Sequence, residues 1–190
     1  MNYLPNIISV VRILLVAPTM YFLWQQQFHL ALILFLIAGI SDGLDGFLAR
    51  RFGWQTRLGT YLDPIGDKLL LIGCYLLLGM LKIVPLWLVL LVIGRDILIV
   101  VGAALYRYAV KDAAMQPLLI SKINTVMQIL LVLVLLYKLS MTPALMAYTL
   151  DHVDFVLMIV VAFTTVLSGV AYVVGWSQRI LQSLKKRQAL

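Results

Sequence analysis

Long apolar runs separated by short polar breaks make up most of this chain. Six of these runs are each close to the length of about 20 residues that crosses a bilayer core as a helix. They occupy residues 5–24, 28–51, 59–81, 84–108, 118–139 and 153–176. The runs are apolar on all sides, whereas the strands of a membrane barrel would alternate in polarity, so the pattern predicts helices.

The composition predicts that these helices cross a membrane. Of the 190 residues, 63% are hydrophobic and 12% are charged, and the mean hydropathy is +1.02, far from the balance of a water-soluble domain. We therefore predict an all-α, polytopic integral membrane protein of six transmembrane helices, forming a single domain over residues 1–190. Because Arg12 interrupts the first run and no small-residue cleavage site follows it, we expect the first span to stay in the protein.

Basic residues at the ends of the spans and between them predict the orientation. They collect on one side of the six-span topology: Arg50, Arg51, Arg57, Arg107, Lys111, Lys122, Arg179, Lys185, Lys186 and Arg187, whereas the other side has little more than Lys82 and Lys138. The positive-inside rule then places both termini in the cytoplasm. The net charge of +7 favours contact with anionic lipid headgroups over binding of nucleic acid.

Four aspartates stand out in the stretch SDGLDGFLARRFGWQTRLGTYLDPIGDK, residues 41–68. Asp42 and Asp45 are three residues apart, and Asp63 and Asp67 are four apart, so each pair projects from one face of its helix. The short connection between the two helices predicts an antiparallel pair. All four carboxylates are then expected to meet near its cytoplasmic end.

Four clustered carboxylates repel one another unless protons or cations neutralise them. Their hard oxygen atoms suit Mg²⁺ or Mn²⁺, and two such ions could clamp a phosphoryl group. We therefore predict phosphoryl-transfer chemistry. An ion or proton pathway in a small transporter is the alternative function for the same aspartates.

Small and basic residues beside the aspartates leave room for a phosphorylated substrate. Gly46 follows Asp45, and Gly59 lies on the facing helix, where a missing side chain lets a ligand approach the backbone. Arg50 comes about one helical turn after Gly46, placed to meet a diphosphate with its forked donors.

These residues together carry a resemblance. The pattern Asp42-x-x-Asp45-Gly46-x-x-Ala49-Arg50, followed after eight residues by Gly59-x-x-x-Asp63-x-x-x-Asp67, resembles the signature of the CDP-alcohol phosphatidyltransferase family. The resemblance implies an enzyme in which an acceptor hydroxyl attacks the lipid-side phosphate of a CDP-linked lipid and releases CMP. It also implies a homodimer. With the orientation predicted above, we expect the active site on the cytoplasmic side of the inner (plasma) membrane.

Residue roles follow from the resemblance by position. It implies two divalent cations, Mg²⁺ or Mn²⁺, held by Asp42, Asp45, Asp63 and Asp67, and it makes Asp67 the general base as well. The residues that the resemblance places at the CDP-lipid site are Asp42, Gly46, Ala49, Arg50 and Gly59.

Three later segments bear on the acceptor alcohol. VPLWLVLLVIGRDILIV, LLISKINTVMQ and VAFTTVLSG resemble the CMP-forming cardiolipin synthase branch of the family, which joins CDP-diacylglycerol to phosphatidylglycerol. Glycerol-3-phosphate, giving phosphatidylglycerophosphate, is the alternative acceptor. We predict that Arg95, Arg107 and Lys122 bind the acceptor phosphate, although Arg95 could instead form a structural pair with Asp96, and Lys122 could be an interfacial lysine.

Overall fold

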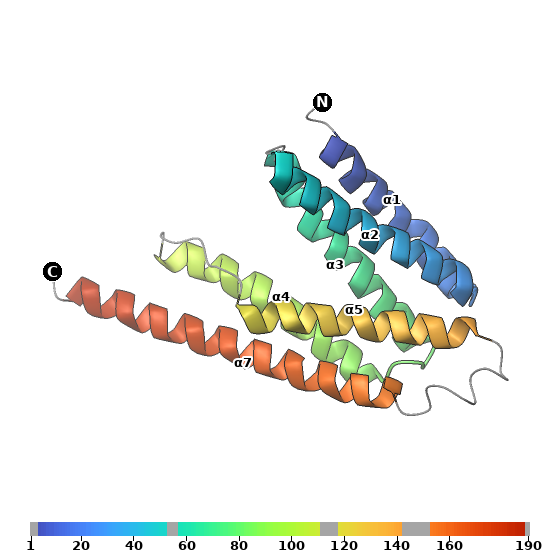
Figure 1. The fold of residues 1–190 in the computed structure, drawn as a ribbon. Coiled ribbons are helices and arrows are strands. Elements are labelled where there is room, and N and C mark those ends of the chain that lie inside the picture. The colour runs from blue at the N-terminus through green and yellow to red at the C-terminus, as the bar shows by residue number, and fades with distance from the viewer. Residues whose placement is uncertain (1–3, 53–56, 111–117, 142–152, 189–190) are drawn as a thin grey trace. The chain divides into compact units, whose positions relative to one another are not determined.

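The computed structural model of the chain is helical throughout the residues that it describes. It describes the backbone of residues 4–52, 57–110, 118–141 and 153–188, and the side chains of residues 11–41, 43, 66, 68–103, 118–141 and 153–178. The helices in these ranges are α1 (Leu4–Trp24), α2 (Phe28–Phe52), α3 (Arg57–Met80), α4 (Leu86–Val110), α5 (Leu119–Ser140) and α7 (Val153–Gln188) (Figure 1). The all-α prediction is confirmed for this part of the chain.

Most helix ends lie within two residues of the predicted ones, but the last helix is longer than expected. It was predicted to end at residue 176, ahead of a basic tail, whereas α7 continues to Gln188. The added sequence, SQRILQSLKKRQ, contains neither Gly nor Pro and is rich in residues with good helix propensity. The helix therefore continues where the apolar pattern that predicted it has ended.

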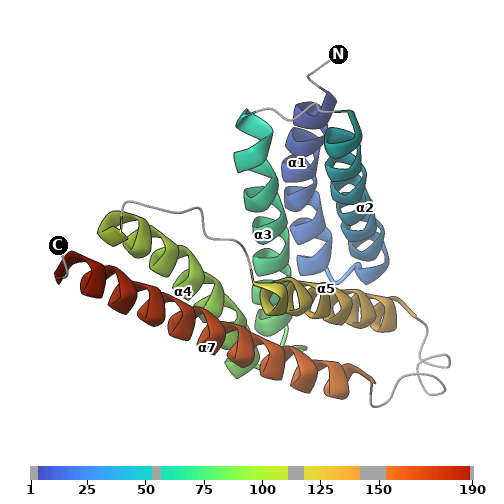
Figure 2. The same cartoon turned by 60° about the vertical axis from the view of Figure 1, so that its left-hand side comes forward.

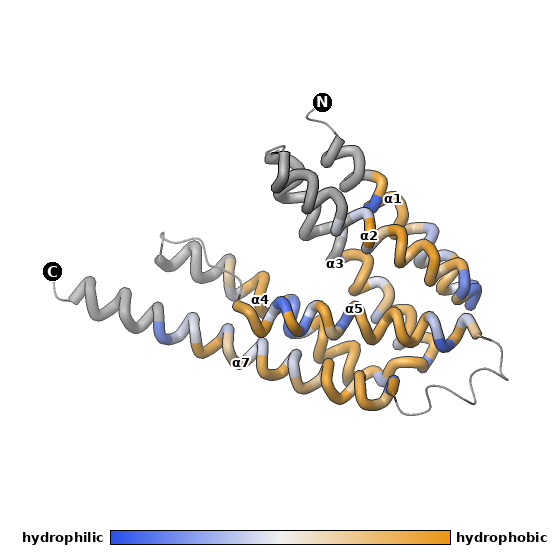
Figure 3. The backbone as a smooth tube through the Cα atoms, viewed as in Figure 1, coloured by the Kyte–Doolittle hydropathy of each residue, from blue (hydrophilic) through white to orange (hydrophobic). Residues whose placement is uncertain are grey.

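Within the residues whose side chains are described, three helices are long and apolar enough to cross a membrane. Their apolar segments are Leu86–Ala103, Leu119–Ser140 and Val153–Gln178. Figure 3 shows hydrophobic residues along most of the described parts of α4, α5 and α7. Among the described side chains of the first three helices, the apolar segments are shorter: Val11–Trp24, Phe28–Ser41 and Lys68–Met80. Membrane crossing by all six helices stays a prediction.

The helices form two compact units. The first comprises residues 1–84 and 132–152, with α1, α2 and α3, and the second comprises residues 85–131 and 153–190, with α4 and α7. Helix α5 contributes residues to both. The single-domain organisation stays a prediction.

In the first unit, α1 packs against both α2 and α3 (Figures 1 and 2). Glycines of α3 allow the close approach of α1. A side-chain carbon built on Gly66 would lie 3.3 Å from Ile13, and one built on Gly73 would lie 2.6 Å from the sulfur of Met20. Because both residue numbers increase together between these two contacts, α1 and α3 run parallel.

Helices α1 and α3 end in the same way, with a residue in the left-handed conformation. Gln26 has a φ of 57° and Lys82 a φ of 59°. After α1, Gln26 N donates to the Leu23 carbonyl at 3.1 Å and Gln27 N to the Phe22 carbonyl at 2.9 Å. This pair of hydrogen bonds forms a Schellman motif, which satisfies carbonyls that the helix end would leave unpaired. The chain reverses at this point into α2.

In the second unit, α4 packs against α7. Gly102 of α4 contacts the indole ring of Trp176, so closely that a side-chain carbon at this position would overlap the ring. Trp176 and Tyr172 form a buried cluster with Ile99 packed against it. The missing side chain at Gly102 therefore allows a large aromatic residue to fill the space between the two helices.

Candidate functional site

The four signature aspartates lie on neighbouring helices of the first unit. Asp42 and Asp45 fall in roughly the last three turns of α2. Asp63 and Asp67 fall in roughly the first three turns of α3. Residues 53–56 connect the two helices, which contact each other. The backbone therefore brings the four positions to adjoining helix ends, while their side chains lie outside the described residues.

The predicted CDP-lipid residues share this location. Gly46, Ala49 and Arg50 lie on α2 and Gly59 lies on α3, and their side-chain environments also fall outside the described residues. Among the described side chains, no group of three or more His, Cys, Asp or Glu residues could hold a metal ion. The metal prediction therefore continues to rest on the aspartates of α2 and α3.

Arg12 of α1 lies against the aspartate-bearing part of α3. Its side chain is 1% exposed, and its Cδ atom would lie 3.7 Å from a side-chain carbon built on Gly66. Gly66 directly precedes Asp67 and follows Asp63 by three residues. The sequence interpretation assigned Arg12 no part in the site.

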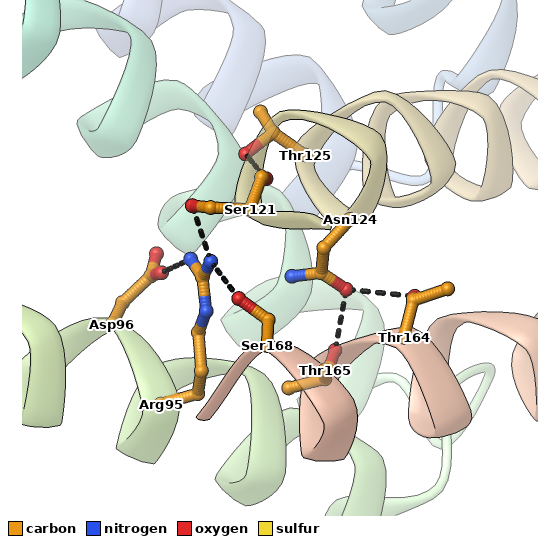
Figure 4. A network of polar contacts seen from close by, with 8 residues as sticks. All are labelled: Arg95, Asp96, Ser121, Asn124, Thr125, Thr164, Thr165 and Ser168. Carbon is orange, nitrogen blue, oxygen red and sulfur yellow. Dashed lines mark hydrogen bonds and ion pairs between the residues drawn. The ribbon is translucent and has the colours of Figure 1, made fainter. Parts of the chain in front are cut away.

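Arg95 of α4 is at the centre of a buried polar cluster in the second unit (Figure 4). Its Nη1 atom donates to Asp96 Oδ1 at 2.8 Å. Its Nη2 atom donates at 2.6 Å to Ser121 Oγ on α5 and at 2.6 Å to Ser168 Oγ on α7. With Arg95 only 7% exposed, these contacts compensate a charge that would be costly to bury alone.

Part of the Arg95 guanidinium has no hydrogen-bond partner within this cluster. Of the five N–H groups of an arginine, three have partners in the contacts above. The Nε atom of Arg95 is buried without a hydrogen-bond partner among the described residues. The structural pair between Arg95 and Asp96, one of the two roles expected from the sequence, is present. A further N–H group of Arg95 could still donate a hydrogen bond to a phosphate.

A second set of polar contacts lies beside this cluster. Asn124 of α5 is fully buried, and its Oδ1 atom accepts hydrogen bonds from Thr164 at 2.8 Å and from Thr165 at 2.9 Å, both on α7 (Figure 4). Such bonds hold helices together where apolar surfaces alone give little preference for one partner. Together, the two sets of contacts connect α4, α5 and α7.

The other two predicted acceptor residues take no part in the hydrogen bonds of this cluster that are described above. Lys122 follows Ser121 on α5 and is exposed. Arg107 lies 12 residues after Arg95 on α4, about 18 Å along the helix axis, with its side chain outside the described residues. Arg95 and Arg107 can meet one phosphate only if both side chains extend toward each other.

The sequence contained weak signals for the residues that its interpretation missed. Arg12 is a single charged residue in an apolar helix, which by itself demands a buried partner. Ser168, Thr164 and Thr165 are small polar residues in an otherwise apolar run, where they commonly bond to a neighbouring helix. Which residue each one contacts depends on the packing, so the pairing could not be predicted.

Two mammalian proteins are similar in sequence to most of this chain. The proteins of Rattus norvegicus and Homo sapiens named cardiolipin synthase (CMP-forming) are each 31% identical to this chain over 189 residues, covering 89% of the chain and 60% of the relative. The chain therefore spans about three fifths of the length of these curated relatives.

A plant protein with a different name is also similar to most of this chain. The chloroplastic CDP-diacylglycerol–glycerol-3-phosphate 3-phosphatidyltransferase 1 of Oryza sativa subsp. japonica is 34% identical over 194 residues, covering 92% of this chain and 57% of the relative. The sequence model of the CDP-alcohol phosphatidyltransferase family matches residues 2–168. This match includes all four aspartates and residues of both units. The chain therefore belongs to the CDP-alcohol phosphatidyltransferase family.

Proposed function

We propose that this chain is an integral membrane enzyme of phospholipid synthesis. It transfers the phosphatidyl group of CDP-diacylglycerol to phosphatidylglycerol and releases CMP, so that the product is cardiolipin. The observation that supports the transferase function is the complete family signature on α2 and α3, within the residues that the family model matches. The choice of acceptor rests on the charge around Arg95. A transporter function for the aspartates has no support from the family match.

The donor set suits a divalent cation. All eight acidic residues of the chain are aspartates, and four of them occupy the adjoining ends of α2 and α3. Two Mg²⁺ or Mn²⁺ ions held by Asp42, Asp45, Asp63 and Asp67 would supply the positive charge that a diphosphate requires. Arg50, on the same segment of α2, adds forked donors for the phosphate oxygens.

The proposed reaction is a substitution at the lipid-side phosphorus. A hydroxyl oxygen of the acceptor forms a bond to this phosphorus, and the bond from the phosphorus to the oxygen of the CMP group breaks. Asp67 accepts the hydroxyl proton as the general base. CMP leaves with the electron pair of the broken bond, and the phosphodiester product stays in the bilayer.

The charge around Arg95 favours phosphatidylglycerol as the acceptor. Asp96 lies 2.8 Å from the Arg95 guanidinium and offsets its charge, which leaves less net positive charge for binding an anion. A dianion such as glycerol-3-phosphate, taken from water, requires more basic groups than the monoanionic phosphodiester of phosphatidylglycerol. Lys122, exposed on α5, would supply charge beside this cluster.

Glycerol-3-phosphate is the second candidate acceptor. The similarity to the Oryza sativa protein favours it, because that protein is named for transfer to glycerol-3-phosphate and matches 92% of this chain. Both acceptors carry a phosphate and a free hydroxyl group. Arg95, Arg107 and Lys122 could therefore serve either one.

The membrane arrangement is part of the proposal. Six spans with both termini in the cytoplasm would put the ends of α2 and α3 on the side where most of the Lys and Arg residues collect. We also propose a homodimer, as the resemblance implies. Cytoplasmic location of the site would give it access to lipids of the inner leaflet and to water for release of CMP.

The test is a transfer assay with purified protein. Labelled CDP-diacylglycerol is supplied with phosphatidylglycerol or with glycerol-3-phosphate, and the lipid product is identified. We expect cardiolipin from phosphatidylglycerol. Phosphatidylglycerophosphate from glycerol-3-phosphate, with no cardiolipin from phosphatidylglycerol, would establish the second acceptor, and no CMP release with either would contradict the function.

Two further measurements test the site. Chelation of divalent cations should abolish CMP release, and added Mg²⁺ or Mn²⁺ should restore it. Lys122→Ala should raise the KM for the acceptor more than the KM for CDP-diacylglycerol. Full activity in chelator would contradict the metal-dependent scheme.

A further inference from the structure

Arg12 is a buried cation in the first unit to which the proposed reaction assigns no role. Its side chain is 1% exposed, although arginine is among the residues least often fully buried. A charge in this position is costly unless an opposite charge lies close by. The surroundings of Arg12 therefore have to supply compensating charge.

The packing of α1 on α3 places Arg12 level with the signature aspartates. Its Cδ atom occupies the space beside Gly66, at 3.7 Å from where a side-chain carbon would lie. The position of Asp63 is three residues before Gly66 and shares its side of the helix. Side chains lean toward the N-terminus of their helix. Because α1 and α3 run parallel, we expect the rest of the Arg12 side chain to extend from Gly66 toward the level of Asp63.

The acidic residues that could compensate Arg12 are few. Within α1, α2 and α3 they are Asp42, Asp45, Asp63 and Asp67. Two of these, Asp63 and Asp67, flank the glycine that Arg12 packs against. Asp63, Asp67 and Arg12 thus belong to the same part of the first unit. There the arginine and the carboxylates can compensate each other's charge.

We propose that Arg12 is a positioning residue that supplies the counter-charge for Asp63 and Asp67. This inference rests on the proposed function, because it takes these aspartates as ligands of divalent cations. The arginine holds the carboxylates together before a cation binds, and it opposes part of the attraction that they exert on the cation. Arg12 therefore raises the stability of the metal-free protein and lowers the affinity of the site for the divalent cation.

The proposal predicts opposite effects of removing the charge. Arg12→Met replaces the arginine with an unbranched apolar side chain. The carboxylates then lose one compensating charge and repel one another more strongly, so the metal-free protein should unfold at a lower temperature. Mn²⁺ should bind this variant at least about tenfold more tightly, because the positive charge of Arg12 no longer opposes it. A ligand that binds more tightly raises the unfolding temperature by a larger amount.

The experiment uses the purified full chain in detergent. Thermal unfolding is measured in chelator and in Mn²⁺, and Mn²⁺ binding is measured directly from the electron paramagnetic resonance signal of the free ion. Arg12→Met should show a lower Tm in chelator, a larger rise in Tm with Mn²⁺ and tighter binding. Arg12→Lys, which retains the charge, should keep a rise in Tm close to that of the wild type.

A matched control comes from the same helix. Thr19 is fully buried on α1 and its hydroxyl donates to the Leu15 carbonyl at 2.7 Å, so Thr19→Val alters a buried polar position without a charge. Its rise in Tm with Mn²⁺ should equal that of the wild type. If Arg12→Met does not fold in chelator, recovery of folded protein by Mn²⁺ supports the proposal, and Arg12→Gln replaces it in the comparison.

The inference would be overturned if Arg12→Met or Arg12→Gln bound Mn²⁺ with wild-type affinity and showed the same rise in Tm as the wild type. Arg12 would then only fill space. The wild type separates this outcome from failure of the proposed function. If the wild type binds no Mn²⁺ and needs none for CMP release, the metal scheme itself is wrong.

Discussion

Arg95 on α4 donates a hydrogen bond of 2.6 Å to the hydroxyl oxygen of Ser168 on α7. The two residues are 73 positions apart in the chain, and both are buried. The same Nη2 atom also donates to Ser121 on α5. One guanidinium therefore connects three helices of the second unit, and the loss of any of these hydroxyls should be measurable.

Ser168→Ala should destabilise the protein by about 1–3 kcal/mol, because it removes the acceptor of a buried, charge-assisted hydrogen bond. The matched control is Ser177→Ala on the same helix, where an exposed hydroxyl donates to the Val174 carbonyl of its own helix. That change should alter the stability by less than about 0.5 kcal/mol. Denaturant unfolding followed by circular dichroism measures both, and equal effects would argue against a structural role for the Ser168 contact.

Asp63→Asn and Asp67→Asn should fail in different ways. Loss of a metal ligand should remove Mn²⁺ binding and activity together in Asp63→Asn. Loss of the general base in Asp67→Asn should lower kcat by about 10²-fold or more while much of the affinity for CDP-diacylglycerol is retained. Lipid binding and CMP release measured on the same preparations separate the two roles, and near wild-type turnover of Asp67→Asn would show that another group takes the proton.

Gly102→Ala should weaken the packing of α4 on α7. A methyl group at this position would overlap the indole ring of Trp176, and such overpacking costs about 1–3 kcal/mol. Gly94→Ala on the same helix is the control, since nothing lies within 4 Å of its side-chain position. We expect a lower Tm for Gly102→Ala and an unchanged or higher Tm for Gly94→Ala, and the opposite order would contradict the described contact.

Gln26→Gly should stabilise the turn after α1. Gln26 holds the left-handed conformation, with a φ of 57°, which costs a residue with a side chain about 1 kcal/mol relative to glycine. Gln25 is the control: its N–H donates to the Tyr21 carbonyl at 3.0 Å, as in a regular helix, so Gln25→Gly should lower the stability or leave it unchanged. Thermal unfolding of the two variants tests the difference, and a higher Tm for Gln25→Gly than for Gln26→Gly would be inconsistent with the cap.

The helices and the signature could be predicted from the sequence because both depend on local patterns. Apolar runs bounded by polar residues predicted α2 at 28–51, and the structure has Phe28–Phe52. The run that begins at residue 153 did not predict that α7 extends to Gln188, because that extension depends on helix propensity and not on hydropathy. The spacing of the aspartates identified the family before any fold was available, and it needed no knowledge of distant contacts.

Only the tertiary structure decided which buried polar groups meet. The sequence alone left Arg95 between a structural pair and an acceptor contact, and it could not show that Ser168 would share this arginine. Nor did it connect Arg12 with Gly66, since the two lie on different helices and nothing local relates them. A buried charge has to find its partners through space, so its role depends on which helices pack together and in which direction they run.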